Sequence, residues 1–331
     1  MTDVRSGPAS DRGDAVNNTT AVAGPFVHPA LFYRDGGEYV AALTAFVREG
    51  LADGDPVAIA VPRARLELLR DALGPDGSGV RFVDMEEAGR NPGRIIPRVL
   101  RAFADAHPGR HVRIIGEPIW ASRSATEYPA CVQHEALINH AFAGRRVTIV
   151  CPYDTARLDP RAVADAYATH PVIIDGDRNG PSGSYAPDHI IAAYNQPLPP
   201  PRAGSVLSFD FDDELLPEAR HAVVERAVAL GLAPERRDDL ALAVAELTTN
   251  SVVHGGGTGT VRIWAEGGHV VWEVQDRGHV TDPLAGRRPP SPDRPGGRGL
   301  LLVHTLSDLV RTHTGPGGTT TRCLLTRVPS S

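Results

Sequence analysis

Three polar residues recur at every fourth position of a helix predicted between residues 238 and 254. Glu246, Asn250 and His254 are spaced i, i+4 and i+8, so they form one stripe along that helix. A carboxylate, an amide and an imidazole on one stripe could serve a divalent ion and its water, and their oxygens suit Mg²⁺. The same stripe is also typical of a solvated helix face, and these three residues alone leave both interpretations open.

An acidic residue ends the predicted strand Val270–Asp276. Apolar residues alternate along this strand and Asp276 continues their face, so its carboxylate lies at the mouth of an apolar layer. Such a carboxylate can accept a hydrogen bond from an exocyclic amine, for example that of adenine. Gly278 follows two residues later, where a backbone without a side chain can pass close to a ligand. The alternative is a simple turn at the end of a strand.

A glycine-rich segment opens the predicted helix Gly299–Leu306. Glycines expose backbone amides and a helix N-terminus favours anions, so this segment could cradle phosphates. The loop before it carries three arginines, Arg287, Arg288 and Arg294. They could close over bound phosphates as a lid, although the loop could equally be a disordered insertion.

The order of these signals resembles the N, G1 and G2 boxes of the Bergerat-fold (GHKL) ATPases. The series is Glu246-x-x-x-Asn250-Ser-x-x-His254, Asp276-x-Gly278, Gly297-Arg298-Gly299-Leu300 and Gly318-Thr319. The resemblance spans about residues 205–327. Its short two-helix start, without dimerisation helices before it, is similar to the anti-sigma-factor serine/threonine kinases (RsbW-like).

This resemblance implies ATP and Mg²⁺ as cofactors. Asn250 would hold the Mg²⁺, Glu246 would be the general base toward a partner's serine or threonine hydroxyl, and Asp276 would bind the adenine amine. The other nucleotide-binding residues that it implies are His254, Gly278, Gly297, Arg298, Gly299, Leu300 and Thr319. Its partners would be a sigma factor, an anti-anti-sigma (STAS) protein or both, and modules of this type often form homodimers.

One position departs from the family pattern. Val280 stands where the G1 box usually has a second glycine, so lid hinging or nucleotide affinity could differ. The alternative to a kinase is therefore a protein that sequesters its partner in an ATP-dependent way without transferring phosphate.

The elements that must position these residues follow from apolar periodicity. From residue 205 to 328 a strand, two helices, two strands, a long loop, a helix and two strands predict an α+β sandwich, with helices on one side of a mixed sheet. From 26 to 176, short Val/Ile runs alternate with amphipathic stretches, which predicts an α/β domain with a mainly parallel sheet. Residues 177–204 are rich in Gly and Pro and are predicted to be a linker, with Ile190–Tyr194 docking back. Residues 1–25 are predicted to be a disordered tail.

Four pieces of the first region resemble the MEDS sensory domain of regulators of small-carbon metabolism. They are His28 with Tyr33, Gly116-Glu117-Pro-Ile-Trp120, Glu135 with Asn139, and Cys151-Pro-Tyr153-Asp154. The resemblance implies a pocket for an unknown small molecule, formed by His28, Glu117, Trp120, Glu135, Tyr153 and Asp154. Several of these residues follow predicted strands, and pockets of open α/β sheets lie beyond the carboxyl ends of strands. Trp120 and Cys151 could instead be core residues, and His28 with Cys151 are too few to define a metal site.

A second functional alternative comes from the sequence His134-Glu135-Ala-Leu-Ile-Asn139. It resembles the phosphoacceptor box of sensor histidine kinases, which would autophosphorylate on His134. The proline that usually follows the asparagine is absent, and the surrounding sequence lacks the paired long helices of such kinases.

Composition excludes several classes of function. The 331 residues contain 34 basic residues, all arginine, and 40 acidic residues, for a formal net charge of −6. Without lysine there is no Schiff base and no P-loop phosphate lysine, and the acidic balance argues against direct nucleic-acid binding. Three distant cysteines form no disulfide framework. No apolar run is long enough for a membrane span and the N-terminus lacks a signal-peptide core, so the sequence predicts a cytoplasmic protein.

Overall fold

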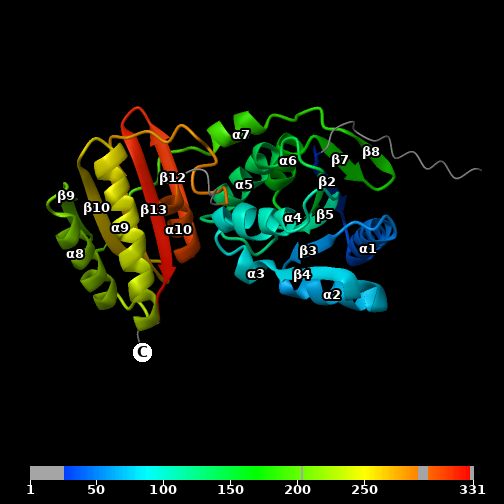
Figure 1. Cartoon of the computed structure of the whole chain (residues 1–331), viewed down its shortest axis with the longest axis horizontal. Coiled ribbons are helices and arrows are strands. Elements are labelled where there is room, and N and C mark those ends of the chain that lie inside the picture. The colour runs from blue at the N-terminus through cyan, green and yellow to red at the C-terminus, as the bar shows by residue number, and fades with distance from the viewer. Residues whose placement is uncertain (1–25, 203, 290–296, 329–331) are drawn as a thin grey trace, which may run out of the picture.

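The computed structural model describes residues 26–202, 204–289 and 297–328, which build two sheets with their own helices (Figure 1). The first sheet has eight strands in the order β4-β3-β5-β6-β2-β7-β8, with β1 paired to β6. Its strands are β1 (Phe26–Val27), β2 (Pro29–Tyr33), β3 (Val57–Val61), β4 (Val80–Asp84), β5 (Val112–Gly116), β6 (Val147–Asp154), β7 (Val172–Asp175) and β8 (Arg178–Pro181). Every pairing is parallel except that of β7 with β8. The predicted α/β class is confirmed.

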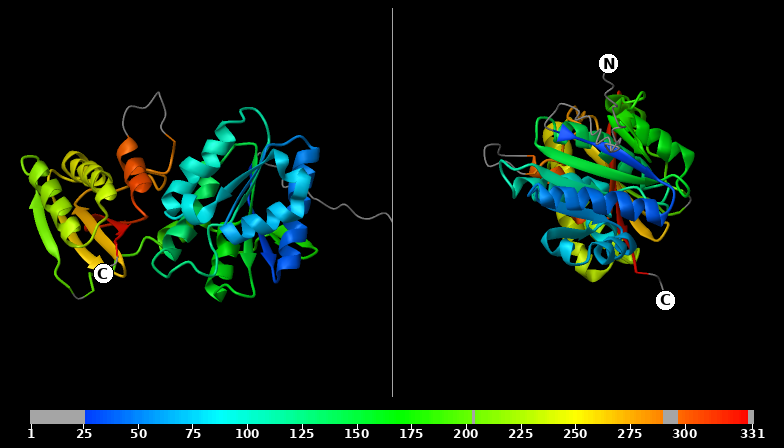
Figure 2. Two further views of the ribbon diagram at one scale, coloured as in Figure 1. Left: turned by 90° about the horizontal axis from the view of Figure 1, so that it is seen from below. Right: turned by 90° about the vertical axis from the view of Figure 1, so that its right-hand side faces the viewer.

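Helices cover both faces of this sheet (Figure 2). They are α1 (Gly36–Ala52), α2 (Arg63–Leu73), α3 (Met85–Ala88), α4 (Arg101–Asp105), α5 (Tyr128–Ala141), α6 (Pro160–Thr169) and α7 (Pro187–Ala193), with a π-helical turn at Ile95–Leu100. Leucines of α1 and α2 pack with one set of strand residues, and α4 to α7 pack with the other. Two separate apolar layers result, because successive strand residues point to opposite faces.

Two parts of this region differ from the sequence-based expectation. Residues 29–33 contain no Val/Ile run of the kind that predicts the other strands, but they form β2, which lies in the middle of the sheet, between β6 and β7. The predicted linker also contributes a strand, since β8 pairs with β7, whereas the docking of Ile190 and Tyr194 in the core through α7 agrees with the expectation. Both segments are buried by strands and helices that are distant in the sequence. A local sequence pattern cannot predict such contacts. We call residues 26–195 the first domain and 205–328 the second domain.

The second sheet has five strands in the order β12-β13-β11-β10-β9. They are β9 (Leu207–Phe211), β10 (Gly259–Glu266), β11 (His269–Asp276), β12 (Leu309–Gly315) and β13 (Gly318–Thr326). Its helices are α8 (Leu216–Ala229), α9 (Arg237–His254) and α10 (Arg298–Leu306), which pack on one face. The predicted α+β sandwich is confirmed, but the sheet expected to be mixed is antiparallel throughout its four pairings.

The first domain packs on part of the other face of the second sheet. Trp264, Val271, Leu309 and Leu324 form a small apolar cluster with Ala130 of α5. Side-chain hydrogen bonds reinforce this contact: the Asn91 amide donates to the carbonyl of His304 at 2.8 Å. Burial on both faces explains why five consecutive residues of β11 are buried, although only alternate ones were expected to be.

The helices of the described residues include none that is long and apolar enough to cross a membrane. The tail predicted at residues 1–25 and Arg294 of the predicted lid lie outside the described residues.

Candidate functional site

A cavity of about 660 Å³ opens between α9, the end of β11, the segment that follows β11 and the start of α10. Eight residues predicted to bind nucleotide line it: Asn250, His254, Asp276, Gly278, Gly297, Gly299, Leu300 and Thr319. Arg298 is exposed and is not among the lining residues, and Glu246 lies beside Gly299. The structure therefore brings together residues that are up to about seventy positions apart in the chain.

Helix α9 positions the polar stripe because its apolar side is fixed. Leu240, Val244 and Leu247 are buried against the sheet, which leaves Glu246 and Asn250 half-buried toward α10. Two aspartates in the first turn of α9 interact favourably with its dipole. Apolar packing on the opposite side of the helix therefore holds the stripe in place, with Glu246 and Asn250 half-buried and His254, at the end of α9, exposed.

Asp276 is held at both carboxylate oxygens. The Ser251 hydroxyl donates to Oδ2 at 2.6 Å, and the Gly278 amide donates to Oδ1 at 2.8 Å. A carboxylate has about four acceptor positions, so both oxygens can still accept a further hydrogen bond. Ser251 was not predicted as a site residue. Its position four residues after buried Leu247 is the signal that could have placed it beneath the cavity.

Two glycines allow backbone and side chains to meet at the cavity. A Cβ atom on Gly299 would lie 2.5 Å from Oε2 of Glu246 and 3.4 Å from Nδ2 of Asn250. Gly318 has φ +111°, and a Cβ atom there would lie 1.9 Å from the carbonyl oxygen of Asp276. Side chains at these positions would push α10 away from α9 and β13 away from β11.

Two threonines hold the segment that follows Asp276. The Thr319 hydroxyl donates to the Gly278 carbonyl at 2.8 Å, and the Val280 amide donates to the Thr314 hydroxyl at 3.2 Å. The two threonine hydroxyls lie 3.0 Å apart. Thr314 is held in turn by Asn195 of the first domain, whose amide group bonds both the carbonyl and the N–H of Thr314, at 2.8 and 3.0 Å. A continuous set of hydrogen bonds thus joins the first domain to the nucleotide-site candidate.

The segment between β11 and α10 also packs on the first domain. Leu284 belongs to the first domain's core cluster. Arg287 is buried beside Cys131 of α5, and this burial lowers the pKa of its guanidinium to about 10. Arg288 lines the cavity and forms an ion pair with Asp282. Of the arginines predicted in the lid, one therefore faces the cavity and one faces the first domain.

Five of the six residues predicted for the sensory pocket lie in two separate groups. Glu117 and Asp154 lie at the carboxyl ends of the strands, near Arg65, Tyr33 and Tyr39. The Tyr39 hydroxyl donates to Glu117 at 3.0 Å, and Arg65 approaches Asp154 at 3.4 Å. Burial raises the pKa of Glu117 to about 8.

The remaining predicted pocket residues lie elsewhere. His28, Glu135 and Tyr153 lie on the opposite face of the sheet, in the larger core. Tyr153 cannot share a pocket with Asp154, because adjacent strand residues point to opposite faces. Trp120 is half-exposed, with the Arg123 guanidinium 3.9 Å from its ring centre.

His134, the residue of the histidine-kinase alternative, is fully buried on α5. Neither ring nitrogen has a hydrogen-bond partner among the described residues, and burial lowers the pKa of the imidazole to about 3. A phosphoacceptor must meet the terminal phosphate of ATP, and His134 is not accessible in this conformation.

Two family models match separate parts of the chain. Residues 27–171 match the MEDS family (methanogen/methylotroph, DcmR sensory domain), and residues 209–324 match the histidine kinase-like ATPase domain. Among solved structures, the RsbU and RsbW domains of a Mycobacterium tuberculosis protein are similar over 38% of this chain, with 23% identity and a TM-score of 0.29. This chain spans 34% of that chain. No curated protein is significantly similar.

Proposed function

We propose, from the premise that this chain joins a MEDS sensory domain to a histidine kinase-like ATPase domain, that it is a cytoplasmic signalling regulator of the anti-sigma-factor kinase type. The first domain senses a small molecule, and the second binds ATP and phosphorylates a partner protein on serine or threonine. The observation that carries this proposal is the convergence of Asn250, Asp276 and the start of α10 on one cavity. The partner is a sigma factor, an anti-anti-sigma (STAS) protein, or both.

The donor set of the cavity fits a nucleotide with Mg²⁺. Asp276 has acceptor positions free for the adenine amine, and the amides at the start of α10 favour phosphate. Glu246 and Asn250 flank Gly299 and offer side-chain oxygens, the ligand type that Mg²⁺ prefers. Asn250 would hold the ion, which when bound neutralises phosphate charge.

Glu246 is the general base of the proposed transfer. Its carboxylate accepts the proton of the partner's hydroxyl as that oxygen bonds the γ-phosphorus. The bond from this phosphorus to the bridging oxygen breaks, and ADP leaves. The half-buried position of Glu246 beside the start of α10 supports this role, because the α10 amides and the base then face the same phosphate.

The structure offers different support to the two alternatives. Burial of His134 disfavours autophosphorylation on that residue, because α5 would have to leave the core first. ATP-dependent sequestration without phosphate transfer remains the second candidate. Val280 is held through its backbone by Thr314, so the position that departs from the family pattern is fixed on the sheet and does not form a free hinge.

The test is a capture experiment with the full chain and lysate of the native host, in Mg-ATP and in Mg-ADP, followed by phosphosite mapping. We expect a sigma factor retained in ATP, or phosphoserine or phosphothreonine on a STAS protein. Glu246→Ala should retain nucleotide and partner but lose more than 99% of the transfer, as expected for about 3 kcal/mol of lost stabilisation. Glu225→Ala, an exposed carboxylate of α8, is the matched control.

Each other outcome has a definite meaning. A sigma factor retained in ATP without any phosphorylation would establish sequestration. Acid-labile phosphate on His134, with no serine or threonine phosphorylation, would overturn the proposed kinase type. Transfer by Glu246→Ala at the wild-type rate would show that Glu246 is not the base.

A further inference from the structure

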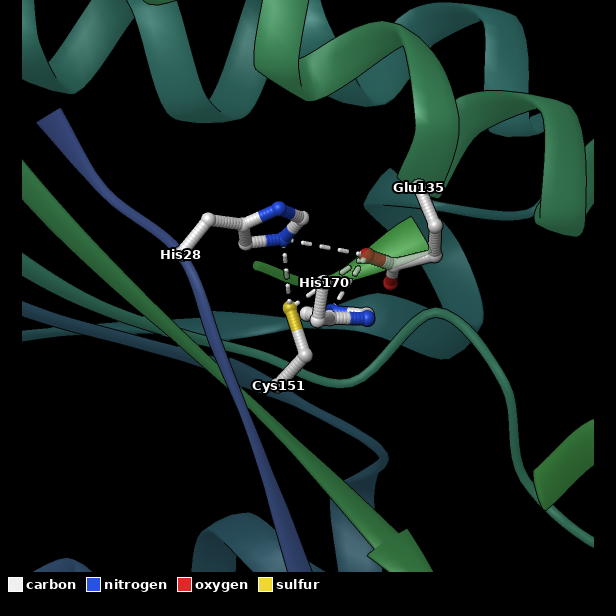
Figure 3. A group of neighbouring side chains, drawn as sticks. All are labelled: His28, Glu135, Cys151 and His170. Carbon is white, nitrogen blue, oxygen red and sulfur yellow. Dashed lines mark hydrogen bonds and ion pairs between the residues drawn. The ribbon is translucent and has the colours of Figure 1, made fainter. Parts of the chain in front are cut away.

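Four side chains with metal-binding atoms meet in the core of the first domain (Figure 3). His28 lies between β1 and β2, Glu135 on α5, Cys151 on β6, and His170 directly after α6. None is more than 1% exposed. Each comes from a different element, and Figure 3 shows all four side chains pointing toward one another.

All four ligand atoms lie within 4.8 Å of one another, and four of their six separations match those around a single tetrahedral ion. Oε2 of Glu135 lies 3.3 Å from Nε2 of His28 and 3.3 Å from Nε2 of His170. Sγ of Cys151 lies 3.4 Å from both Nε2 of His28 and Oε2 of Glu135. Ligand bonds of about 2.0–2.3 Å at tetrahedral angles require separations of roughly 3.3–3.7 Å.

Hydrogen bonds at the Nδ1 atoms of His28 and His170 set the orientation of both imidazole rings. Nδ1 of His28 lies 3.2 Å from Oδ1 of Asn139, and Nδ1 of His170 lies 2.9 Å from the carbonyl of Ala166. The Asn139 amide nitrogen donates to the carbonyl of Thr169 at 2.9 Å, so its oxygen faces His28. Both Nδ1 atoms therefore carry the proton, and both Nε2 lone pairs face the cluster. Histidines that bind metals are oriented in this way.

The cluster is incomplete without a positive charge at its centre. Two imidazole lone pairs would otherwise face the oxygen of a carboxylate that is also an acceptor, at 3.3 Å. Among the described residues, Nε2 of His170 and Oε1 of Glu135 have no hydrogen-bond partner. Buried polar atoms normally have partners, and these side chains have no access to solvent. A divalent ion with one thiolate and one carboxylate would make the group neutral, as an apolar core requires.

We propose that His28, Glu135, Cys151 and His170 bind one Zn²⁺ in a closed tetrahedral site. Imidazole and thiolate donors suit zinc and disfavour Mg²⁺ and Ca²⁺, which take oxygen ligands. Four protein ligands leave no open position, which is typical of structural zinc sites. The ion ties the start of β2, α5, β6 and the start of β7 together, so stability of the first domain depends on it.

The test uses the purified full chain without nucleotide. We expect one Zn²⁺ per chain by mass spectrometry of the metal content. After exchange with Co²⁺ we expect a thiolate-to-cobalt charge-transfer band and the intense visible bands of tetrahedral Co²⁺. Cys151→Ser should lose the charge-transfer band and bind Co²⁺ at least tenfold more weakly. Cys131→Ser, a second fully buried cysteine of the same domain, should keep both the band and the affinity.

Two results would overturn the site. One is a wild-type chain with a native circular dichroism spectrum that takes up neither Zn²⁺ nor Co²⁺. The other is a charge-transfer band that survives Cys151→Ser and disappears in Cys131→Ser. If Cys151→Ser does not fold, the wild-type stoichiometry and cobalt spectrum still decide. The thiolate band also separates this site from Mg²⁺ binding at Asn250, which involves no sulfur.

Discussion

Asp276 illustrates at the scale of one residue how the protein prepares a binding group. Its oxygens are oriented by Ser251 and by the Gly278 amide, so little ordering remains when a ligand arrives. An amide at this position would present an N–H₂ group, which repels an incoming amine and cannot accept from it. In the proposed nucleotide site, the charge of Asp276 and its fixed orientation would both contribute to the affinity for ATP.

We expect Asp276→Asn to weaken ATP binding at least 100-fold, about 3 kcal/mol, because a charged acceptor is lost and an unsuitable donor is introduced. Isothermal titration with Mg-ATP measures this loss. Asp210→Asn, on the exposed surface of β9, should bind as the wild type does. Unchanged affinity in Asp276→Asn would remove this residue from the nucleotide site.

Glu117 makes a second prediction at this scale, on the pH dependence of stability. Its pKa is about 8 in the folded chain against 4.5 as the ordinary value, because burial disfavours the carboxylate. The folded state therefore binds more protons between these pH values. The neutral Glu117 therefore contributes fully to the free energy of unfolding below pH 4.5. This contribution, up to about 5 kcal/mol, is lost as the pH rises toward 8.

Glu117→Gln removes this titration. Its free energy of unfolding in urea should fall less between pH 5 and pH 8 than that of the wild type. Parallel curves for the two proteins over this range would show that Glu117 does not titrate in the folded state.

At the scale of elements, the candidate site forms where the backbones of neighbouring helices and strands approach each other closely. Strands β11 and β13 pair over eight residue positions, and the pairing ends with Asp276 opposite Thr319. Gly318 begins β13 directly against the Asp276 carbonyl, and Gly299, the second residue of α10, lies directly against Glu246. Glycine in these two positions therefore permits the close packing of the elements around the cavity.

Gly318→Ala should cost at least about 3 kcal/mol of unfolding free energy, since the backbone has positive φ and the new Cβ would strike the Asp276 carbonyl. The neighbouring Gly317→Ala is the control, because its Cβ would meet nothing within 4 Å. Urea denaturation of the full chain measures both. Equal stability of the two variants would contradict the assigned contact.

At the scale of the whole molecule, the first domain contacts the elements around the proposed nucleotide site at several points. Leu284 of the segment after β11 enters its core, and Asn195 holds Thr314, which holds Val280 and contacts Thr319. A ligand that shifts α7 or α5 could thus move the segment that lines the cavity. This arrangement supports control of ATP binding by the first domain.

Asn195→Ala should lower ATP affinity about tenfold, because Thr314 then loses both backbone partners and holds Val280 less firmly. Gln196→Ala, one residue along, should have no effect, since its amide bonds only the carbonyl of Ala193 among the described residues. A double-mutant cycle with Thr314→Val should be non-additive if the two residues act together. Additive effects would show that the hydrogen-bonded route does not carry the coupling.

Local sequence patterns were informative where the predicted feature depends on residues that are close together in the sequence. The i, i+4 stripe on α9 and the alternation on β11 predicted which faces Asn250 and Asp276 occupy, and both line the cavity. The MEDS-like pieces likewise indicated the family model that residues 27–171 match. The prediction that Tyr153 and Asp154 line the same pocket does not agree with the structure, because adjacent residues of a strand point to opposite faces of the sheet.

The sequence by itself determined the α/β and α+β classes of the two domains and most of their helices and strands. These follow from periodicity over a few residues, where backbone geometry dictates side-chain direction. Only the tertiary structure decided that β2 lies mid-sheet, that the second sheet is antiparallel throughout its four pairings, that the first domain packs against this sheet, and that His28 meets Cys151, 123 positions away. Those contacts arise from the packing of whole elements, and no local spacing records which distant residue a buried side chain will face.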